Sequence, residues 1–351
     1  MALELVEPEE VGMSSERLKR INPVMQSYID NGIIAGMNTA IARKGKLVHF
    51  EQLGFMDKES QRPMARDTIF RIYSMTKPII VTALMILYEQ GRFQLFDPVA
   101  KFLPTFGGAN VLEVNSAGEK TEAALQRPVT MRDLFTHTSG LTYDFLLDSP
   151  VGEMYREARL LNDSSRTLEA FVDEILRLPL AFQPGTRWHY SVALDVLAHI
   201  IQIIADKPLG DFLAEELFRP LNMADTGFWI PEEKRQRLAT MYGLPDICGV
   251  NMTVLKAFEA WTQGYNEKID VSATYPVDDP RWARGGAGLV STSMDYLRFA
   301  QMLLNGGELD GVRLLSRKTL ELMYSNHLPE NLLPWELAGI YSYRIWNSWR
   351  G

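Results

Sequence analysis

One serine and one lysine are spaced so that they could form a nucleophile and its base. Ser74 and Lys77 lie three residues apart in the segment Phe70–Pro78 (FRIYSMTKP). On a helix this spacing places both side chains on one face, a turn apart. If Lys77 is buried, lost solvation lowers its proton affinity, and its amine can act as a base toward the Ser74 hydroxyl. The pair indicates acyl transfer. On spacing alone, the stronger alternative is a capping serine followed by a solvated lysine.

The helix that must present Ser74 is predicted over Lys77 to Gln90, with Gly91 at its C-terminal cap. Its residues are apolar on nearly every face, so we expect the helix to be buried. Its N-terminus would then open inside the protein, where free backbone N–H groups and the helix dipole favour an anion. That setting would stabilise an oxyanion and favours the catalytic interpretation of Ser74.

A tyrosine could complete a proton relay. Tyr190 precedes a predicted buried helix over Ala193 to Ala205. A tyrosinate near a cationic lysine can take or pass on a proton. Taken alone, Tyr190 is better interpreted as a packing residue at a helix start. The neighbouring His189, and His137 in a His-Thr-Ser-Gly run, are interpreted as structural, since the chain has no G-x-S-x-G motif to pair with a histidine base.

Two further segments offer substrate contacts. The glycine-rich run 284–292 (RGGAGLVST) lacks the lysine and the spacing of a phosphate loop, so it predicts close backbone packing or a cleft wall, with Gly286 as a candidate substrate-binding residue. The segment 231–284 is irregular and could form the wall of an acyl pocket. Its candidate aromatic residues, for which a role in the core is equally open, are Trp261, Tyr265, Tyr275 and Trp282.

Composition excludes several classes of protein. The 351 residues carry a formal net charge of −8 without a basic stripe, which argues against nucleic acid as a partner. Cys248 is the single cysteine, so no internal disulfide or thiolate cluster can form. The five histidines form no metal-ligand pair on one helix, and no metal or organic cofactor is expected. No run of 18 apolar residues or basic, apolar leader is present, which predicts a soluble, cytoplasmic protein without a membrane span.

The remaining pattern predicts an α+β fold. A helix over Ser14 to Asp30 precedes two strands, Gly36 to Ala42 and Lys46 to Gln52, which suggests a helix packed on an antiparallel sheet. Further helices are predicted over Thr130 to Phe135, Thr167 to Arg177, Leu209 to Phe218, Ser293 to Leu304 and Ser316 to Tyr324. We therefore expect a sheet-containing part, residues 1–68 and 285–351, interrupted by a mainly helical part, residues 69–284.

Taken in order, these segments resemble the serine β-lactamase-related hydrolases, in the branch of class C β-lactamases, DD-peptidases and family VIII carboxylesterases. The resemblance covers roughly residues 10–325. It is carried by the motifs Ser74-Met-Thr-Lys77, His137-Thr-Ser-Gly-Leu141, Tyr190-Ser191 and Gly285–Thr292. It implies a site between an antiparallel sheet with flanking helices and a helical domain, with Ser74 as nucleophile and Lys77 and Tyr190 sharing its proton. It also implies chemistry on a small-molecule ester or lactam without a cofactor.

Two departures from the family pattern shape the expected activity. The family usually has Asn two residues after the tyrosine, where this chain has Val192, and this favours an esterase over an efficient β-lactamase. The family's third motif, Lys-Thr-Gly or a variant on a late strand, has no clear counterpart in Gly339 to Gly351, and Lys318-Thr319 lies in a helical pattern. We therefore expect the C-terminal strands to be missing or shortened. A β-lactamase, a D-amino-acid peptidase, an acyltransferase and a non-catalytic penicillin-binding-like protein stay open as alternatives, and so does the oligomeric state.

Overall fold

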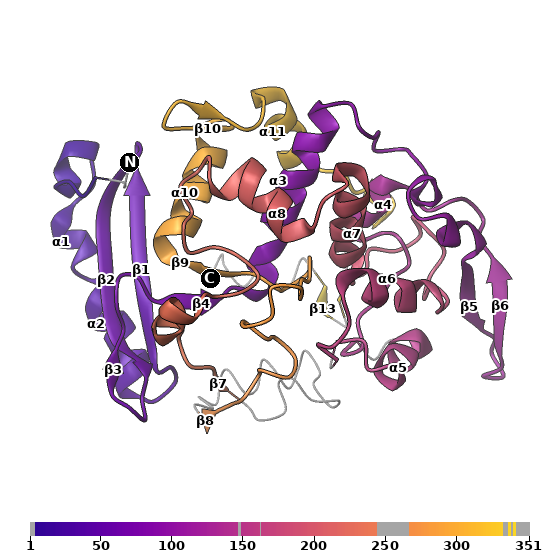
Figure 1. Ribbon diagram of the computed structural model, residues 1–351, viewed down its shortest axis with the longest axis horizontal. Coiled ribbons are helices and arrows are strands. Elements are labelled where there is room, and N and C mark those ends of the chain that lie inside the picture. Colours follow the sequence, from indigo (N-terminus) through magenta and orange to yellow (C-terminus); the bar gives the residue numbers. More distant parts are fainter. Residues whose placement is uncertain are drawn as a thin grey trace.

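The computed structural model describes residues 4–146, 149–161, 163–243 and 267–332, with the backbone of 336–337 and 340–341. Helices and antiparallel sheets are combined as the α+β prediction requires (Figure 1). Most of the C-terminal segment from Gly339, which bears on the predicted loss of strands, lies outside the described residues.

The N-terminal part is an antiparallel sheet covered by helices. Strands β1 (Gly36–Arg43), β2 (Lys46–Asp57) and β3 (Arg62–Pro63) pair in that order, and the two predicted long strands are confirmed. The single helix expected before them is two helices, α1 (Ser15–Leu18) and α2 (Ile21–Asp30). Pro23 gives the reason, since it has no N–H to bond four residues back and fits only the first turn of a new helix. Helix α2 contacts β2 and covers one face of the sheet (Figure 1).

A short strand pair joins two segments that are far apart in the sequence. Strand β4 (Ile69–Arg71), just before Ser74, pairs antiparallel with β9 (Val290–Thr292), just after the glycine-rich segment. Three residues on each strand are too few for an alternating pattern to reveal, so neither strand was predicted. The pairing brings the glycine-rich segment beside the start of the Ser74 helix, since the Ile72 N–H donates to the Leu289 carbonyl at 3.0 Å.

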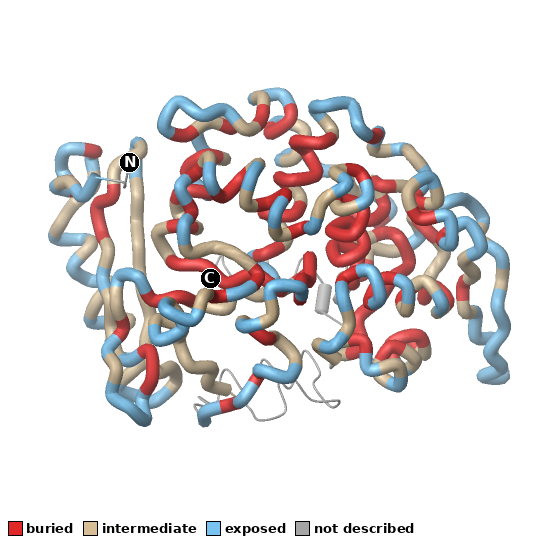
Figure 2. Tube along the Cα trace, in the orientation of Figure 1, coloured by how far each residue is buried: buried red, intermediate tan, exposed pale blue. Residues whose placement is uncertain are grey.

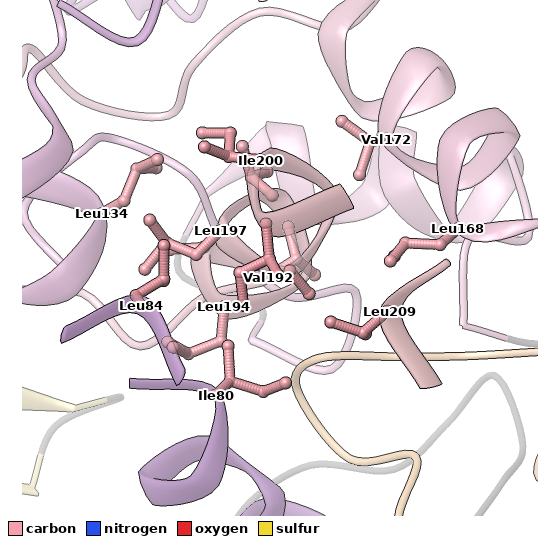
Figure 3. Packing of buried hydrophobic residues seen from close by; sticks show 14 of the residues in the cluster. Ile80, Leu84, Leu134, Leu168, Val172, Val192, Leu194, Leu197, Ile200 and Leu209 are labelled. Carbon is pink, nitrogen blue, oxygen red and sulfur yellow. The ribbon is translucent and has the colours of Figure 1, made fainter. Parts of the chain in front are cut away.

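Helix α3 (Thr76–Glu89) is the buried centre of the helical part, as predicted. It contacts α7 (Ala193–Ala205), whose bounds match the prediction, and α7 in turn contacts α4 (Met131–Phe135), α6 (Leu168–Leu176) and α8 (Leu209–Leu213). Their apolar side chains meet in one cluster (Figure 3), and many of the buried segments gather where these helices lie (Figure 2). This packing fixes α3 and α7 relative to each other, and therefore also the residues that precede each helix.

The other predicted helices also form, with one difference. Helices α10 (Ser293–Leu304) and α11 (Arg317–Tyr324) agree with the prediction, and Lys318-Thr319 is helical as expected. The helix predicted over Leu209 to Phe218 ends at Leu213 and continues as one π turn, Ala214–Phe218. The elements that the sequence pattern did not predict include α5 (Pro150–Glu157) and the short strands β5 (Asn110–Val114), β6 (Lys120–Ala124), β7 (Tyr242–Gly243), β8 (Glu267–Lys268), β10 (Glu308–Leu309), β11 (Val312–Arg313), β12 (Glu336–Leu337) and β13 (Ile340–Tyr341).

The irregular segment 231–284 is described only in part. Glu232–Arg237 form a 3-10 helix, and β7 and β8 pair across the residues 244–266, which lie outside the described part of the chain together with Cys248, Trp261 and Tyr265. Within the described residues, no helix has both the length and the apolar character needed to cross a membrane.

Candidate active site

Ser74 lies on a strained turn at the start of α3. Residues Tyr73–Met75 form a 3-10 turn that runs directly into the helix. Tyr73 has φ +42°, a left-handed conformation that a bulky residue adopts only when its surroundings impose it. Two hydrogen bonds hold the residues that follow Tyr73. Tyr296 of α10 donates to the Met75 carbonyl at 3.0 Å, and the Leu289 N–H donates to Thr76 Oγ1 at 3.1 Å. The turn is therefore held from both the helix α10 and the glycine-rich segment.

The N-terminus of α3 is open to solvent, which corrects the prediction that it opens inside the protein. Ser74 and Met75 are exposed, whereas Thr76 and most of the apolar residues that follow are buried. The apolar character that buries the helix begins only after the serine, so the packing covers the body of α3 and leaves its first turn free. A carbonyl substrate can therefore reach the Ser74 hydroxyl from outside.

The three residues proposed for catalysis meet at one oxygen. Ser74 Oγ lies 2.8 Å from the phenol oxygen of Tyr190 and accepts a hydrogen bond of 3.0 Å from Lys77 Nζ. Tyr190 reaches this position from the segment just before α7, 116 residues away in the chain. Both groups are within the distance at which a proton can pass directly to or from the hydroxyl.

Lys77 has a second fixed contact. Its Nζ donates to the carbonyl oxygen of Gly286 at 2.7 Å, and lies 4.7 Å from the ring centre of Tyr190 and 5.7 Å from that of Tyr143. Lys77 is half-buried, so part of its stem is covered by these rings. A lysine held at two oxygens has little freedom to turn away from Ser74.

The two neighbouring histidines make structural contacts. His137 Nδ1 lies 3.1 Å from Ser191 Oγ, and its ring centre is 5.0 Å from that of Tyr190. Burial, together with the charges of Lys77 and His189, lowers the pKa of His137 to about 3, so its ring is neutral at physiological pH. His189 is buried, and its Nε2 lies 2.9 Å from Thr142 Oγ1. Both ring positions agree with the structural roles predicted for these residues.

Two residues of the site were not predicted from the sequence. Asp195, in the first turn of α7, is 2% exposed and accepts a hydrogen bond of 3.0 Å from the Gly286 N–H. Tyr143 packs against Tyr190, with ring centres 5.1 Å apart. A signal for Asp195 was present, because it is the one acidic residue of an otherwise buried helix, and buried acids are rare unless they have partners. No comparable signal marks Tyr143.

The candidate residues of the pocket wall that the structure describes differ in how far they are buried. Tyr275 is half-buried, and its ring centre lies 4.8 Å from that of Tyr73, which neighbours Ser74. Trp282 is 3% exposed, and it packs between Tyr275 and the guanidinium of Arg284. Gly286 has both backbone polar atoms engaged, its N–H by Asp195 and its carbonyl by Lys77. Of these residues, Tyr275 is thus the one placed where it could border a substrate bound at Ser74.

The part of the chain that the structure describes contains no group of three or more His, Cys, Asp or Glu residues that could hold a metal ion.

The chain is similar to a known protein family and to several known proteins. A family model described as Beta-lactamase matches residues 21–335. The chain is 35% identical over 308 residues to Protein Rv1367c of Mycobacterium tuberculosis, which covers 87% of this chain and 71% of that protein. It is 30% identical over 287 residues to Esterase EstB of Burkholderia gladioli, covering 80% of this chain and 68% of the esterase. The solved structure of EstCE1, described as a hydrolase with promiscuous acyltransferase activity, has a TM-score of 0.71 and 28% identity, and covers 90% of this chain and 79% of EstCE1.

Proposed function

The chain belongs to the Beta-lactamase family, and from this premise we propose that it is a serine hydrolase that cleaves carboxylic esters through an acyl-enzyme. The observation that carries the proposal is the hydrogen-bonded junction of Ser74, Lys77 and Tyr190 at the exposed start of α3. This is the arrangement of an activated nucleophile with its base in reach.

In the first half-reaction, Ser74 Oγ attacks the carbonyl carbon of the ester. The hydroxyl proton passes to Lys77 and Tyr190, which share it while the tetrahedral oxyanion forms. We assign the stabilisation of the growing negative charge to the backbone N–H of Ser74, just before α3, where the helix dipole is positive. The shared proton then moves to the leaving alkoxide as the carbon–oxygen bond breaks. An alcohol departs and the acyl group stays on Ser74.

In the second half-reaction, water or an acceptor alcohol takes the place of the departed alcohol. The same two residues remove its proton while its oxygen attacks the acyl carbon, and they return the proton to Ser74 Oγ as the ester to the enzyme breaks. With water the product is a carboxylic acid, and with an alcohol the product is a new ester.

An ester is favoured over a lactam as substrate by the position after the tyrosine. Val192 stands where β-lactamases of the family usually carry an amide, and it is fully buried. No side-chain amide is therefore supplied there to hold a lactam substituent or to orient Lys77. The names of two relatives point the same way, since they are an esterase of Burkholderia gladioli and a lovastatin esterase of Penicillium rubens, the latter 27% identical to this chain.

The test compares two chromogenic substrates and locates the covalent adduct. We expect turnover of p-nitrophenyl butyrate at a kcat/KM at least about tenfold above that of nitrocefin, with a fluorophosphonate adduct mapped by mass spectrometry to the peptide containing Ser74. Faster turnover of nitrocefin would reassign the enzyme as a β-lactamase. Stable labelling by a fluorescent penicillin with no turnover of either substrate would favour a binding protein, and an adduct on another residue would reject the site.

Replacing Tyr190 by phenylalanine removes one of the two proton-transfer groups and leaves the ring in place. We expect Tyr190→Phe to lower kcat for p-nitrophenyl butyrate on the order of 10²–10³-fold, within the range of general acid–base contributions. The measurement is steady-state kinetics with circular dichroism to check the fold. Tyr28→Phe, at an exposed tyrosine of α2, is the matched control and should keep the wild-type rate. A wild-type rate in Tyr190→Phe would leave Lys77 as the sole base.

A further inference from the structure

The glycine-rich segment and Asp195 form a unit that the proposed reaction steps leave without a role. Asp195 Oδ1 accepts a hydrogen bond of 3.0 Å from the Gly286 N–H, and the carbonyl of the same Gly286 accepts one of 2.7 Å from Lys77 Nζ. Three groups from α7, the glycine-rich segment and α3 are thereby connected in series. This series of hydrogen bonds ends at the Lys77 amine, which also contacts Ser74 Oγ.

The packing around Gly286 leaves it little room to move. A β-carbon at this position would lie 2.6 Å from Asp195 Oδ2, closer than real β-carbons approach other atoms, and 3.0 Å from the Tyr143 hydroxyl, which is a tight contact. At Gly285, a β-carbon would collide with the Leu194 carbonyl and Ala198 of α7. The absence of side chains at both positions lets the backbone lie directly on the first turns of α7. This contact explains the two glycines, for which the sequence predicted close backbone packing or a cleft wall.

We propose that Asp195 is a positioning residue, which fixes the backbone of Gly286 at its N–H so that the Gly286 carbonyl holds the Lys77 amine against Ser74. The proposal rests on the proposed function, because it assigns a task only if Lys77 serves the nucleophile. Among the described residues Asp195 makes no hydrogen bond to Ser74 or Lys77, so its hydrogen-bonded link to the amine runs through Gly286. Its direct charge interaction with Lys77 is lost equally in Asp195→Asn and Asp195→Leu, so a difference between them reports the link through Gly286. A lysine stem has four rotatable bonds, and a fixed acceptor selects the one arrangement in which the amine reaches the hydroxyl.

The size of the expected effect follows from geometry. A misplacement of about 1 Å at a reacting group can cost about 10²-fold in rate. Without the Asp195 acceptor, the buried N–H of Gly286 loses this partner, and the peptide bond between Gly285 and Gly286 must rotate or shift to satisfy it. The Gly286 carbonyl, which accepts from Lys77, belongs to the next peptide bond and is joined to the first through the Gly286 Cα, so a shift of the backbone at Gly286 displaces it as well. Substrate binding, which does not use Lys77, should change little.

The experiment compares two changes at Asp195 in the full chain. Asp195→Leu removes the acceptor, and we expect kcat for p-nitrophenyl butyrate to fall about 10²-fold while KM changes less than about threefold. Asp195→Asn keeps one oxygen for the Gly286 N–H, and should recover about tenfold or more of the lost kcat. A kcat near wild type in Asp195→Leu, or equal losses in Asp195→Asn and Asp195→Leu at equal thermal midpoints, would overturn the proposal.

The matched control is another buried aspartate. Asp295 of α10 accepts from the Asp225 N–H at 2.8 Å and from Thr226 Oγ1, and among the described residues no hydrogen bond joins it to Lys77, Gly286 or Ser74. We expect Asp295→Asn to lower the thermal midpoint while kcat per folded enzyme stays within about threefold of wild type. If Asp295→Asn lowers kcat as much as Asp195→Asn does, a general loss of stability explains both and the positioning role is rejected.

A third variant, Gly286→Ala, changes the position of the Gly286 backbone without changing Asp195. Gly286→Ala pushes the segment away from Asp195 and Tyr143, so it should also lower kcat with little change in KM. If Asp195→Leu does not fold, the kcat of Gly286→Ala is measured in its place. A wild-type kcat in Gly286→Ala would overturn the proposal. Failure of the proposed function looks different, since the wild-type enzyme would then hydrolyse no ester and a fluorophosphonate would not label Ser74. That result would overturn both proposals.

Discussion

Replacing Ser74 by alanine is expected to abolish ester hydrolysis, with a fall in kcat on the order of 10⁴–10⁶-fold. Ser74 Oγ is the atom at which Lys77 and Tyr190 meet, and both are hydrogen-bonded to it rather than to each other. Without this oxygen no acyl-enzyme forms, and the remaining groups can only assist the direct attack of water. The measurement is the turnover of p-nitrophenyl butyrate by Ser74→Ala, together with the loss of the fluorophosphonate adduct.

The fold should survive this change, because Ser74 is exposed and its hydroxyl contacts only the two catalytic partners among the described residues. We expect the circular dichroism spectrum and the thermal midpoint to stay close to those of the wild type. Ser27→Ala is the matched control, since the exposed Ser27 hydroxyl bonds only to its own helix at the Val24 carbonyl. Activity near the wild-type level in Ser74→Ala would reject Ser74 as the nucleophile.

Replacing Lys77 by methionine is expected to produce the second-largest loss, with kcat reduced on the order of 10³–10⁵-fold. Methionine has a similar length and fills the space between the Tyr190 and Tyr143 rings, so the change removes the amine more than it removes packing. The hydroxyl of Ser74 then keeps only Tyr190 as a proton partner. Rapid-mixing kinetics should show the loss in the acylation step, before any change in deacylation becomes visible.

Two comparisons make this result specific. Lys101→Met removes an exposed lysine that pairs with Asp97 at 2.8 Å, and it should leave kcat unchanged. The double variant Ser74→Ala with Lys77→Met should be about as inactive as Ser74→Ala alone, because residues that act as a unit are strongly non-additive. A Lys77→Met enzyme with the wild-type rate would move the role of base to Tyr190. Losses that simply multiply in the double variant would show that Lys77 acts elsewhere than on Ser74.

Local sequence patterns determined most of the helical framework of this protein. The apolar run after Lys77 predicted a buried helix, and the spacing in Ala193 to Ala205 gave α7 its observed bounds. Ser74 and Lys77 could be paired from sequence because a single helix turn sets the distance between residues three apart. Tyr190 was a candidate from its place before a predicted buried helix, but only the family resemblance implied that it meets Ser74, since no local rule connects residues 116 positions apart.

The tertiary structure alone decided how these pieces meet. Pairing of β4 with β9 sets Gly286 beside Lys77, and three-residue strands carry too little pattern to be predicted. The acceptor role of Asp195 depends on two glycines lying against α7, a contact between segments about 90 residues apart. Periodicity and spacing predict the local backbone conformation over a few helical turns. The distance between two distant segments is set by how the whole core packs, and this is why the residue types of the site could be predicted while the support that holds its lysine could not.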